Sequence, residues 1–495
     1  MELPNTFIES LEWRYKENCR EDFSEFINSF NNDWIRAWRL QTTRMEAVEA
    51  AEIMAQELGE GRYTAQDFLR PVPWCQDGYY IPQNARPGLT SLHQMGLIYI
   101  QEASAMLPAE VLRPRPGDRV LDLCAAPGGK SLQLAKRLGG SGLLVSNDIS
   151  ESRARALHRN LELAGAQNSY VSVLDPSTDI PHTWFEYFDK VQLDAPCSGE
   201  GMFRRDPRAI TSWTDFGPES IRTVQSRLLD VAAQVTKVGG HLAYSTCTFN
   251  TVENEEMIST FLEQYPQFRV VSVENLSGVE NGLQGVGIHA DLAKALRIWP
   301  QSGLGDGHFC CLLEKTAPIE NHLRPIKSKK ISRNTDFPSK KDAMKAYKDF
   351  IARHVIDEKQ DEYLKKNIRL LRNLLFLIEE ELPSMDDLRL LKSGCFLGEL
   401  KSKGKSHYVL HASHPLLLEM HPEIWQWTLN LSREDERVAK LLRGETISLN
   451  DEEQRALAGA KASDFLAILC DGHSLCWGKK NQSTIKNLFP ASWVR

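Results

Sequence analysis

The chain has 495 residues and a formal net charge of −7, with 42% hydrophobic residues. This length indicates two to four domains, and the negative charge excludes a protein that is basic throughout, so any nucleic-acid site must be regional. Ten cysteines without a C-x-x-C pair fit neither a disulfide scaffold nor a zinc module, and the chain has neither a signal-peptide pattern nor a run of about twenty apolar residues. We therefore expect a cytoplasmic protein with no metal and no membrane span.

Residues 1–108 form a predicted N-terminal domain that is mixed but mostly helical, with helices near 7–11, 22–30 and 44–58. Between the second and third helices, W-I-R-A-W-R-L-Q at 34–41 has β character and places Arg36 and Arg39 beside Trp34 and Trp38. Arginines that alternate with aromatic residues suit contacts with RNA phosphates and unpaired bases. An ordinary strand whose arginines reach the surface explains the pattern equally well.

Residues 109–315 alternate between strand and helix patterns, as a parallel α/β sheet requires. The central stretch is R-V-L-D-L-C-A-A-P-G-G-K at 119–130, a short apolar strand followed by a tight turn of small residues and a helix. Neither G-x-G-x-x-G nor G-x-x-x-x-G-K-[ST] is present. The turn therefore favours a nucleoside ligand without a pyrophosphate.

Acidic residues follow three of the predicted strands. Asp148 comes about twenty residues after the glycines, where an acid can bind both ribose hydroxyls, although it could instead cap the following helix. Asp175 and Asp194 follow two later strands, and Ser245, Thr246 and Cys247 follow a fourth. In a parallel sheet these residues converge at one edge, where ligands bind.

Two cysteines lie in loops of small residues just beyond strands, Cys197 in D-A-P-C-S-G-E-G-M-F-R-R-D-P and Cys247 in S-T-C-T-F. A thiolate that adds to carbon-6 of cytosine makes carbon-5 nucleophilic enough to accept an electrophilic methyl group. Asp194 is a candidate to hydrogen-bond or protonate ring nitrogen-3. The group that removes the carbon-5 proton is not identified by the sequence. Most other cysteines are expected to be small buried hydrophobes.

Residues 316–385 are predicted to be a basic linker followed by a helical segment over 343–382, and residues 386–495 a small mixed β domain. The linker is a candidate for phosphate contacts, although a merely solvated linker explains its charge equally well. Arg204 and Arg205, beside Met202 and Phe203, are a further hypothetical contact for the RNA phosphate or base.

The segments DLCAAPGGK, DAPCSGEGMFR and STCTF, in this order and spacing, resemble the Nop/Sun family of S-adenosylmethionine-dependent RNA cytosine-5 methyltransferases. L-R-G-E-T-I from Leu442 and D-G-H-S-L-C-W-G-K-K from Asp471 are similar to its bacterial RsmF-type branch, which acts on 16S ribosomal RNA. The resemblance implies a Rossmann-like methyltransferase domain between an N-terminal RNA-binding domain and a C-terminal PUA-like α+β domain.

The resemblance also implies roles for individual residues. Cys247 would be the nucleophile, Cys197 would assist release of the product, and Asp194 would lie between cofactor and cytosine. S-adenosyl-L-methionine would contact the loop, Asp148, Arg153 and Asp175, although the residues around Asp175 match the family pattern least well. The loop residues are Cys124, Ala125, Ala126, Pro127, Gly128, Gly129 and Lys130.

Three functions follow from these patterns. The first is methylation of cytosine in ribosomal RNA, on the free 16S molecule or the small ribosomal subunit, by a monomeric enzyme. The second is an RNA-binding assembly factor that keeps the cofactor fold, but such a factor needs neither Cys197 nor Cys247. The third is a small-molecule methyltransferase, which needs neither a basic linker nor a C-terminal domain.

Overall fold

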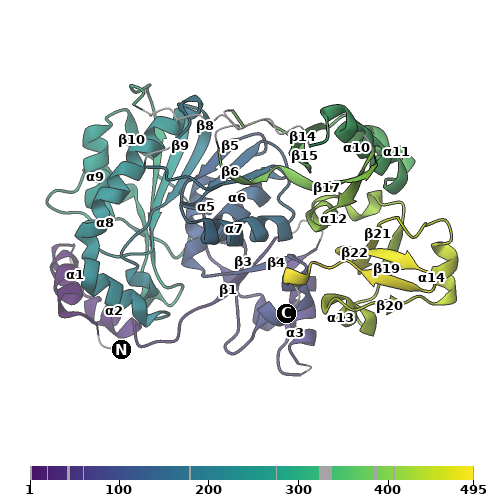
Figure 1. The fold of residues 1–495 in the computed structure, drawn as a ribbon. Helices are drawn as coiled ribbons and strands as arrows, with labels where there is room; N and C mark the ends of the chain where they lie inside the picture. Colours follow the sequence, from purple (N-terminus) through teal and green to yellow (C-terminus); the bar gives the residue numbers. More distant parts are fainter. Residues whose placement is uncertain are drawn as a thin grey trace.

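The computed structural model describes the chain except for residues 1–2, 19, 42–44, 60, 178–179, 275, 323–336, 381, 384–387, 405–406 and 494–495. Its largest sheet has ten strands in the order β11-β12-β13-β9-β8-β5-β6-β7-β16, with β10 paired to β13. No helix in the described ranges is both long and apolar enough to cross a bilayer. Figure 1 shows this sheet between helices α1 (Asn5–Glu17) and α2 (Phe23–Ser29) on one side and the C-terminal part on the other.

Five neighbouring strands of this sheet run parallel, as the alternating pattern predicts. They are β5 (Arg119–Asp122), β6 (Leu143–Asn147), β7 (Ser169–Ser172), β8 (Phe188–Asp194) and β9 (Thr236–Thr246). The other strands pair antiparallel at the edges: β10 (Phe268–Val270), β11 (Glu280–Asn281), β12 (Leu296–Ile298), β13 (His308–Lys315) and β16 (Leu390–Ser393).

Helices cover both faces of the sheet. Helices α8 (Pro207–Val235) and α9 (Glu255–Gln264) pack on one face; α5 (Leu107–Leu112), α6 (Gly129–Leu138) and α7 (Glu151–Leu163) pack on the other. Successive strand residues point to opposite faces, so Val120 joins one core and Leu121 the other. Burial on both faces explains the continuous apolar runs in the sequence.

The N-terminal part contains a four-stranded sheet in the order β2-β3-β1-β4. Its elements are β1 (Ala37–Leu40), α3 (Ala47–Glu57), β2 (Pro71–Val72), β3 (Cys75–Tyr80), α4 (Ser91–Gln94) and β4 (Ile98–Gln101). Helices α1 (Asn5–Glu17) and α2 (Phe23–Ser29) instead pack on loops of the large sheet. The predicted helices and the strand near residue 38 are confirmed.

The C-terminal part contains two further sheets, β14-β15-β17-β18 and β19-β21-β22-β23-β20. The first includes α10 (Lys340–His354), α11 (Asp357–Leu364), β14 (Asn367–Leu371), β15 (Leu374–Ile378), β17 (Cys395–Gly404), β18 (His407–Ala412) and α12 (His414–Glu419). The second includes β19 (Thr428–Leu431), α13 (Glu436–Leu442), β20 (Ile447–Ser448), α14 (Asp451–Ala456), β21 (Leu466–Cys470), β22 (His473–Asn481) and β23 (Thr484–Asn487).

The predicted helix over 343–382 is wrong beyond residue 364. Residues 367–378 form the hairpin β14–β15, whose Leu375 and Leu377 are buried in the C-terminal core. Packing of alternate leucines on a sheet overrides their helix propensity. Most basic residues of the predicted linker, from Arg324 to Arg333, lie outside the described residues.

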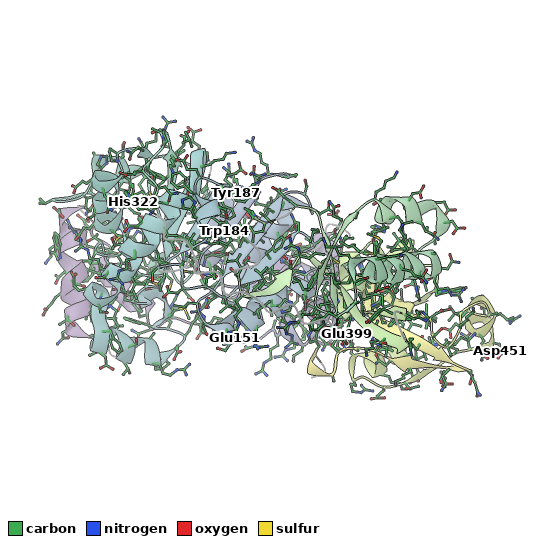
Figure 2. The ribbon with its side chains drawn as sticks, turned by 45° about the horizontal axis from the view of Figure 1, so that its top comes forward. Glu151, Trp184, Tyr187, His322, Glu399 and Asp451 are labelled. Atoms are coloured by element: carbon green, nitrogen blue, oxygen red, sulfur yellow. The ribbon has the colours of Figure 1, made fainter. Side chains whose placement is uncertain are left out.

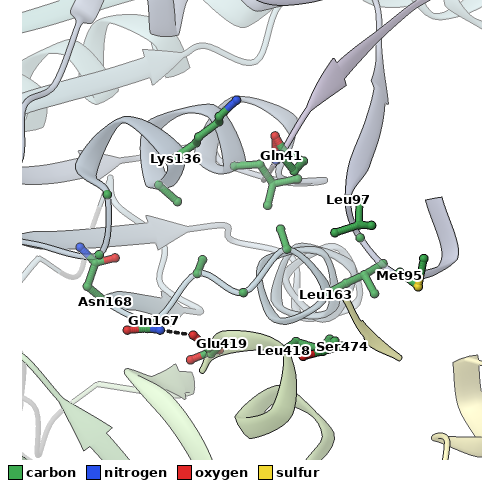
Figure 3. Close-up of a pocket in the computed structure, with 18 of the residues that line it drawn as sticks. Gln41, Met95, Leu97, Lys136, Leu163, Gln167, Asn168, Leu418, Glu419 and Ser474 are labelled. Carbon is green, nitrogen blue, oxygen red and sulfur yellow. Dashed lines mark hydrogen bonds between the residues drawn. The ribbon is translucent and has the colours of Figure 1, made fainter. Parts of the chain in front are cut away.

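The C-terminal part is attached to the large sheet through strand β16, which pairs with β7. The fully buried Lys392 of this strand forms an ion pair of 2.7 Å with Glu419 of α12. Glu419 also lines a cavity of about 260 Å³. Figure 3 shows residues of this cavity, where the Gln167 side chain donates a hydrogen bond to the carbonyl oxygen of Glu419. In Figure 2, Trp184 and Tyr187 mark the large-sheet part and Asp451 the far end of the C-terminal part.

Candidate active site

The predicted reactive residues converge at the carboxyl ends of the parallel strands. From the central strand β5 the chain adds β6 and β7 on one side, then returns to place β8 on the other. Ligands of open α/β sheets bind at such a reversal of strand order. Here it brings the loop after β5 beside Asp194, at the end of β8, and Ser245 lies opposite Asp194 on β9.

The loop 123–129 is held by hydrogen bonds from several elements. Ala125 N donates to the carbonyl oxygen of Asn147 at 2.8 Å, and Arg153 of α7 donates to the carbonyl oxygen of Ala126 at 3.0 Å. Gly128 has φ 115°, a left-handed conformation that disfavours other residues. A side chain there would also approach Leu157 of α7 at 3.0 Å.

The acids after β6 and β7 have local partners. Asp148 is buried; its carboxylate accepts hydrogen bonds from the backbone N–H of Ser150 at 2.9 Å and of Ala126 at 3.3 Å. It thus orders the start of α7 and also faces the loop, so capping and ligand binding can coexist. Asp175 is half-buried and accepts hydrogen bonds from the backbone and hydroxyl of Ser177.

Asp194 lies in a cluster of charged and polar groups. Its Oδ2 is 2.6 Å from Lys130 Nζ, the Ser245 hydroxyl donates to its Oδ1 at 2.8 Å, and His308 Nε2 lies 3.7 Å away. Burial would raise the pKa of Asp194, but the Lys130 charge and the His308 imidazole lower it below its ordinary value. Burial would lower the pKa of Lys130, but Asp194 raises it above its ordinary value. At neutral pH the two therefore form a carboxylate and an ammonium group.

The two cysteines of the predicted chemistry meet at the same edge. Cys197 Sγ lies 3.4 Å from Cys247 Sγ, although fifty residues separate them. Both side chains remain partly exposed. The hydrogen bond with Cys247 and burial raise the pKa of Cys197 well above its ordinary value. Cys197 therefore stays a thiol at neutral pH and can donate a hydrogen bond to the neighbouring sulfur.

A buried polar network that sequence reasoning missed supports both cysteine loops. Glu200 accepts hydrogen bonds from the backbone N–H groups of Phe249 and Asn250, and Glu253 accepts one from Ser198 N at 2.9 Å. The Asn250 side chain donates to both carboxylates, at 2.9 and 2.7 Å. Burial and Glu200 raise the pKa of Glu253 to about 7. The network fixes the loop of Cys197 to the loop of Cys247.

Aromatic residues fix the same loops from outside. Phe203 follows the Cys197 loop and packs 5.3 Å from Phe7 of α1, centroid to centroid; Phe249 follows Cys247 and packs 5.2 Å from Phe26 of α2. The N-terminal helices therefore complete the site. A sequence signal for this contact is the recurrence of Phe7, Phe23, Phe26 and Phe30 within the first thirty residues.

Several residues expected to contact RNA are occupied within the protein. The Arg204 side chain is only 3% exposed, its guanidinium lies 2.6 Å from Asp306 Oδ1, and it also donates to the carbonyl oxygens of Ser29 and Gly305. Trp38 is buried, and Arg39 donates to the carbonyl oxygen of Gly129 at 2.8 Å. The RNA-contact predictions for Arg204, Trp38 and Arg39 are therefore wrong. Arg39 instead supports the start of α6.

Comparisons with known proteins identify similar chains. Family models for the "16S rRNA methyltransferase RsmB/F", the "N-terminal domain of 16S rRNA methyltransferase RsmF" and the "Methyltransferase RsmF PUA domain" match residues 109–314, 3–103 and 428–495.

Curated relatives named ribosomal RNA small subunit methyltransferase F include one from Shewanella piezotolerans, 33% identical over 71% of this chain and 74% of the relative. Another relative, from Shewanella amazonensis, is 38% identical over 54% of this chain. The matched part spans about half (55%) of the length of that relative. A solved methyltransferase homolog protein from Pyrococcus horikoshii is 26% identical, with a TM-score of 0.51 over 63% of this chain and 100% of that one.

Proposed function

This chain belongs to the RsmF-type family of 16S rRNA methyltransferases, and on that basis we propose that it methylates carbon-5 of a cytosine in small-subunit ribosomal RNA, with S-adenosyl-L-methionine as the methyl donor. The observation that carries the proposal is the approach of Cys197 and Cys247 beside the ion pair of Lys130 and Asp194. These four side chains supply the groups that addition of sulfur to a pyrimidine requires.

The residues at the strand ends fit the cofactor. The buried carboxylate of Asp148 at the end of β6 suits two ribose hydroxyls, and the loop from Cys124 to Lys130 leads into the start of α6. Asp122, at the end of β5, is also buried, and its Oδ1 has no hydrogen-bond partner among the described residues. That oxygen is free to accept a hydrogen bond from an amino group. When bound, S-adenosyl-L-methionine supplies an electrophilic methyl group.

Cys247 is the proposed nucleophile. Its thiolate adds to carbon-6 of cytosine, and the electrons of the carbon-5–carbon-6 double bond move toward carbon-5 and the ring. The ammonium of Lys130 stabilises the sulfur anion before it adds. A hydrogen bond from Cys197 stabilises the same anion when it leaves, so Lys130 serves addition and Cys197 serves release.

Asp194 and Lys130 are proposed to act on the other side of the ring. Because Asp194 is ionised, it accepts a hydrogen bond from the 4-amino group and does not itself protonate the base. Lys130 carries the proton that nitrogen-3 needs as charge builds on the ring. Proton transfer of this kind typically accelerates a reaction roughly 10²- to 10⁴-fold.

Release completes the reaction. After carbon-5 has gained its methyl group, a base removes the carbon-5 proton, the double bond re-forms, and the bond between carbon-6 and the Cys247 sulfur breaks. Nitrogen-3 then returns its proton to Lys130. The target base must leave its stack to reach these groups, which requires a few kcal/mol. We propose that residues 1–108 and 386–495 bind the surrounding RNA and so offset that energy.

Bisulfite sequencing of 16S ribosomal RNA tests the proposal. A strain that lacks the gene should lose protection at one or more cytosines, and the wild-type gene should restore it, whereas Cys247→Ala should not. An RNA-binding assembly factor would leave the methylation map unchanged in all strains. A small-molecule methyltransferase would also leave the map unchanged, and the purified protein would then not methylate the RNA.

A further inference from the structure

The N-terminal part carries a basic hollow of about 560 Å³ that the proposed mechanism does not use. It lies beside α3 and the start of β1, which Figure 1 shows below the large sheet. Among its described lining residues none is acidic. The lining comprises Arg36, Leu58, Arg62, Tyr63, Asn84, Ala85, Arg86 and Leu89.

The three arginines of this hollow differ from most others in the chain. Within the described residues, Arg36, Arg62 and Arg86 form no ion pair, whereas Arg14 and Arg437 each contact two carboxylates. Arg62 and Arg86 are exposed. Three uncompensated guanidiniums around one hollow concentrate positive potential in a protein of negative net charge. The hollow therefore favours an anionic ligand.

Aromatic rings accompany these charges. Arg62 lies over the ring of Tyr63 at 5.4 Å, and Tyr63 packs edge-on against Phe68 at 5.6 Å, which fixes its orientation. Trp34 is 46% exposed and has Arg36 over its ring at 5.4 Å. Rings held next to guanidiniums can stack on unpaired bases while the arginines bind phosphates.

A line of contacts joins the hollow to the catalytic loop. Arg205 lies over the Trp34 ring at 4.9 Å, and its backbone N–H donates to the carbonyl oxygen of Met202 at 2.9 Å. Met202 is 36% exposed and follows Cys197 by five residues. The surface thus runs from Cys197 through Met202 and Arg205 to Trp34, then through Arg36 into the hollow.

We propose that this hollow binds a single-stranded segment of the substrate RNA next to the target cytosine, with phosphates on Arg62 and Arg86 and a base against Tyr63. The inference rests on the proposed function, because the ligand is taken to be the RNA that carries the reacting base. An acidic protein segment would satisfy the arginines, but it would not use the rings of Trp34 and Tyr63 or the line of contacts from Trp34 to Met202.

The test compares wild type with Arg62→Ala/Arg86→Ala. The control, Arg115→Ala/Arg269→Ala, removes the same charge near the opposite strand ends, where Arg269 lies beside Glu314. The probe is 16S ribosomal RNA purified from a strain that lacks the gene. The Kd of each protein for this RNA is measured at several salt concentrations, and a methylation assay gives KM and kcat. Circular dichroism checks that each variant is folded.

The variant Arg62→Ala/Arg86→Ala should bind RNA about tenfold more weakly than wild type, and its KM should be about tenfold higher. Its kcat should stay within about twofold of the wild-type value. Loss of two phosphate contacts should reduce the slope of log K against log salt by about 1.4. If the Kd and the salt slope of Arg62→Ala/Arg86→Ala equal those of the control, the inference is overturned. An acidic protein ligand in the hollow would predict that result. If wild-type protein binds but does not methylate the RNA, the proposed function fails, while the Kd comparison still decides the role of the hollow.

Discussion

The sulfur atoms of Cys197 and Cys247 lie 3.4 Å apart at the ends of two parallel strands, β8 and β9. The pair is held by the network of Glu200, Asn250 and Glu253, so its geometry does not depend on a substrate. The hydrogen bond with Cys247 and burial raise the pKa of Cys197. The proposed mechanism therefore assigns the hydrogen-bond donor to Cys197 and the nucleophile to Cys247.

The first prediction concerns Cys197. Cys197→Ala removes the hydrogen bond to the departing sulfur but leaves Cys247 in place, so addition should proceed and release should slow. Denaturing gel electrophoresis should reveal a protein–RNA band that wild type shows only weakly, with turnover reduced about 100-fold or more. Cys470→Ala is the control, because that buried cysteine lies in the C-terminal sheet. Normal turnover of Cys197→Ala would contradict the assigned division between the thiols.

The second prediction concerns Lys130. Lys130→Met should reduce kcat by roughly 10²- to 10⁴-fold, because nitrogen-3 loses its proton donor and Cys247 loses a nearby positive charge. The half-buried Asp194 would also lose the charge that lowers its pKa, so activity should fall at the acidic side of the pH–rate profile.

Lys136→Met is a matched control for Lys130→Met. Lys136 lies on the same helix and is ion-paired with Asp77 at 2.8 Å, but away from the cysteines. Its kcat should stay close to that of wild type. Equal losses in the two variants would show that the effect arises from the helix and not from the chemistry.

The third prediction concerns the ion pair of Arg297 and Glu255. Both side chains are almost completely buried, with Nη2 and Oε2 2.5 Å apart, and Arg297 also donates to the carbonyl oxygen of Phe249. Arg297→Met leaves a buried carboxylate unpaired and should lower the free energy of unfolding in urea by about 3–5 kcal/mol.

Two comparisons accompany Arg297→Met. The double variant Arg297→Met/Glu255→Leu should recover part of the stability, because no buried charge remains. Arg269→Met, which breaks an exposed pair with Glu314, should change the free energy of unfolding by less than about 1 kcal/mol. A similar small change for Arg297→Met would contradict the buried arrangement.

The fourth prediction concerns pH. Burial lowers the pKa of His414 to about 3, and its ring packs edge-on against Phe489 and Trp493. The folded-state pKa of His414 lies below its unfolded value of about 6.5. The free energy of unfolding is therefore unaffected above about pH 6.5 and decreases as the pH falls below that value. At pH 5 the loss should be about 2 kcal/mol, since one pKa unit corresponds to about 1.4 kcal/mol. For His414→Phe, the free energy of unfolding in urea should not show this loss between pH 8 and pH 5.

The loop of the proposed cofactor site was predictable because its signal is local. Residues 119–130 carry a strand, a turn and a helix start within twelve positions, and the structure has β5, the turn and α6 there. The convergence of Asp194 and Cys247 was predictable from the parallel sheet alone. Both predictions need only the local pattern of apolar and small residues and the rule that the carboxyl ends of parallel strands meet at one edge of the sheet.

Other features depend on partners that are distant in the sequence. Arg39 is buried because Gln41, Gln101 and the carbonyl oxygen of Gly129 accept its hydrogen bonds, and no local pattern reveals that set. Glu253 likewise gains its role from Ser198, fifty-five residues earlier. The hairpin β14–β15 forms where leucine-rich sequence suits either helix or strand until packing decides.

Attack of Cys247 on carbon-6 is tested most directly by peptide mass spectrometry of the wild-type protein trapped on RNA that contains 5-fluorocytidine. With fluorine at carbon-5 no proton can be removed, so an adduct formed at carbon-6 persists after methyl transfer. If Cys247 is the nucleophile, the added nucleotide mass lies on the peptide containing Cys247, and its appearance requires S-adenosyl-L-methionine. A nucleotide on the Cys197 peptide, or no covalent mass while unmodified RNA is still methylated, would contradict it.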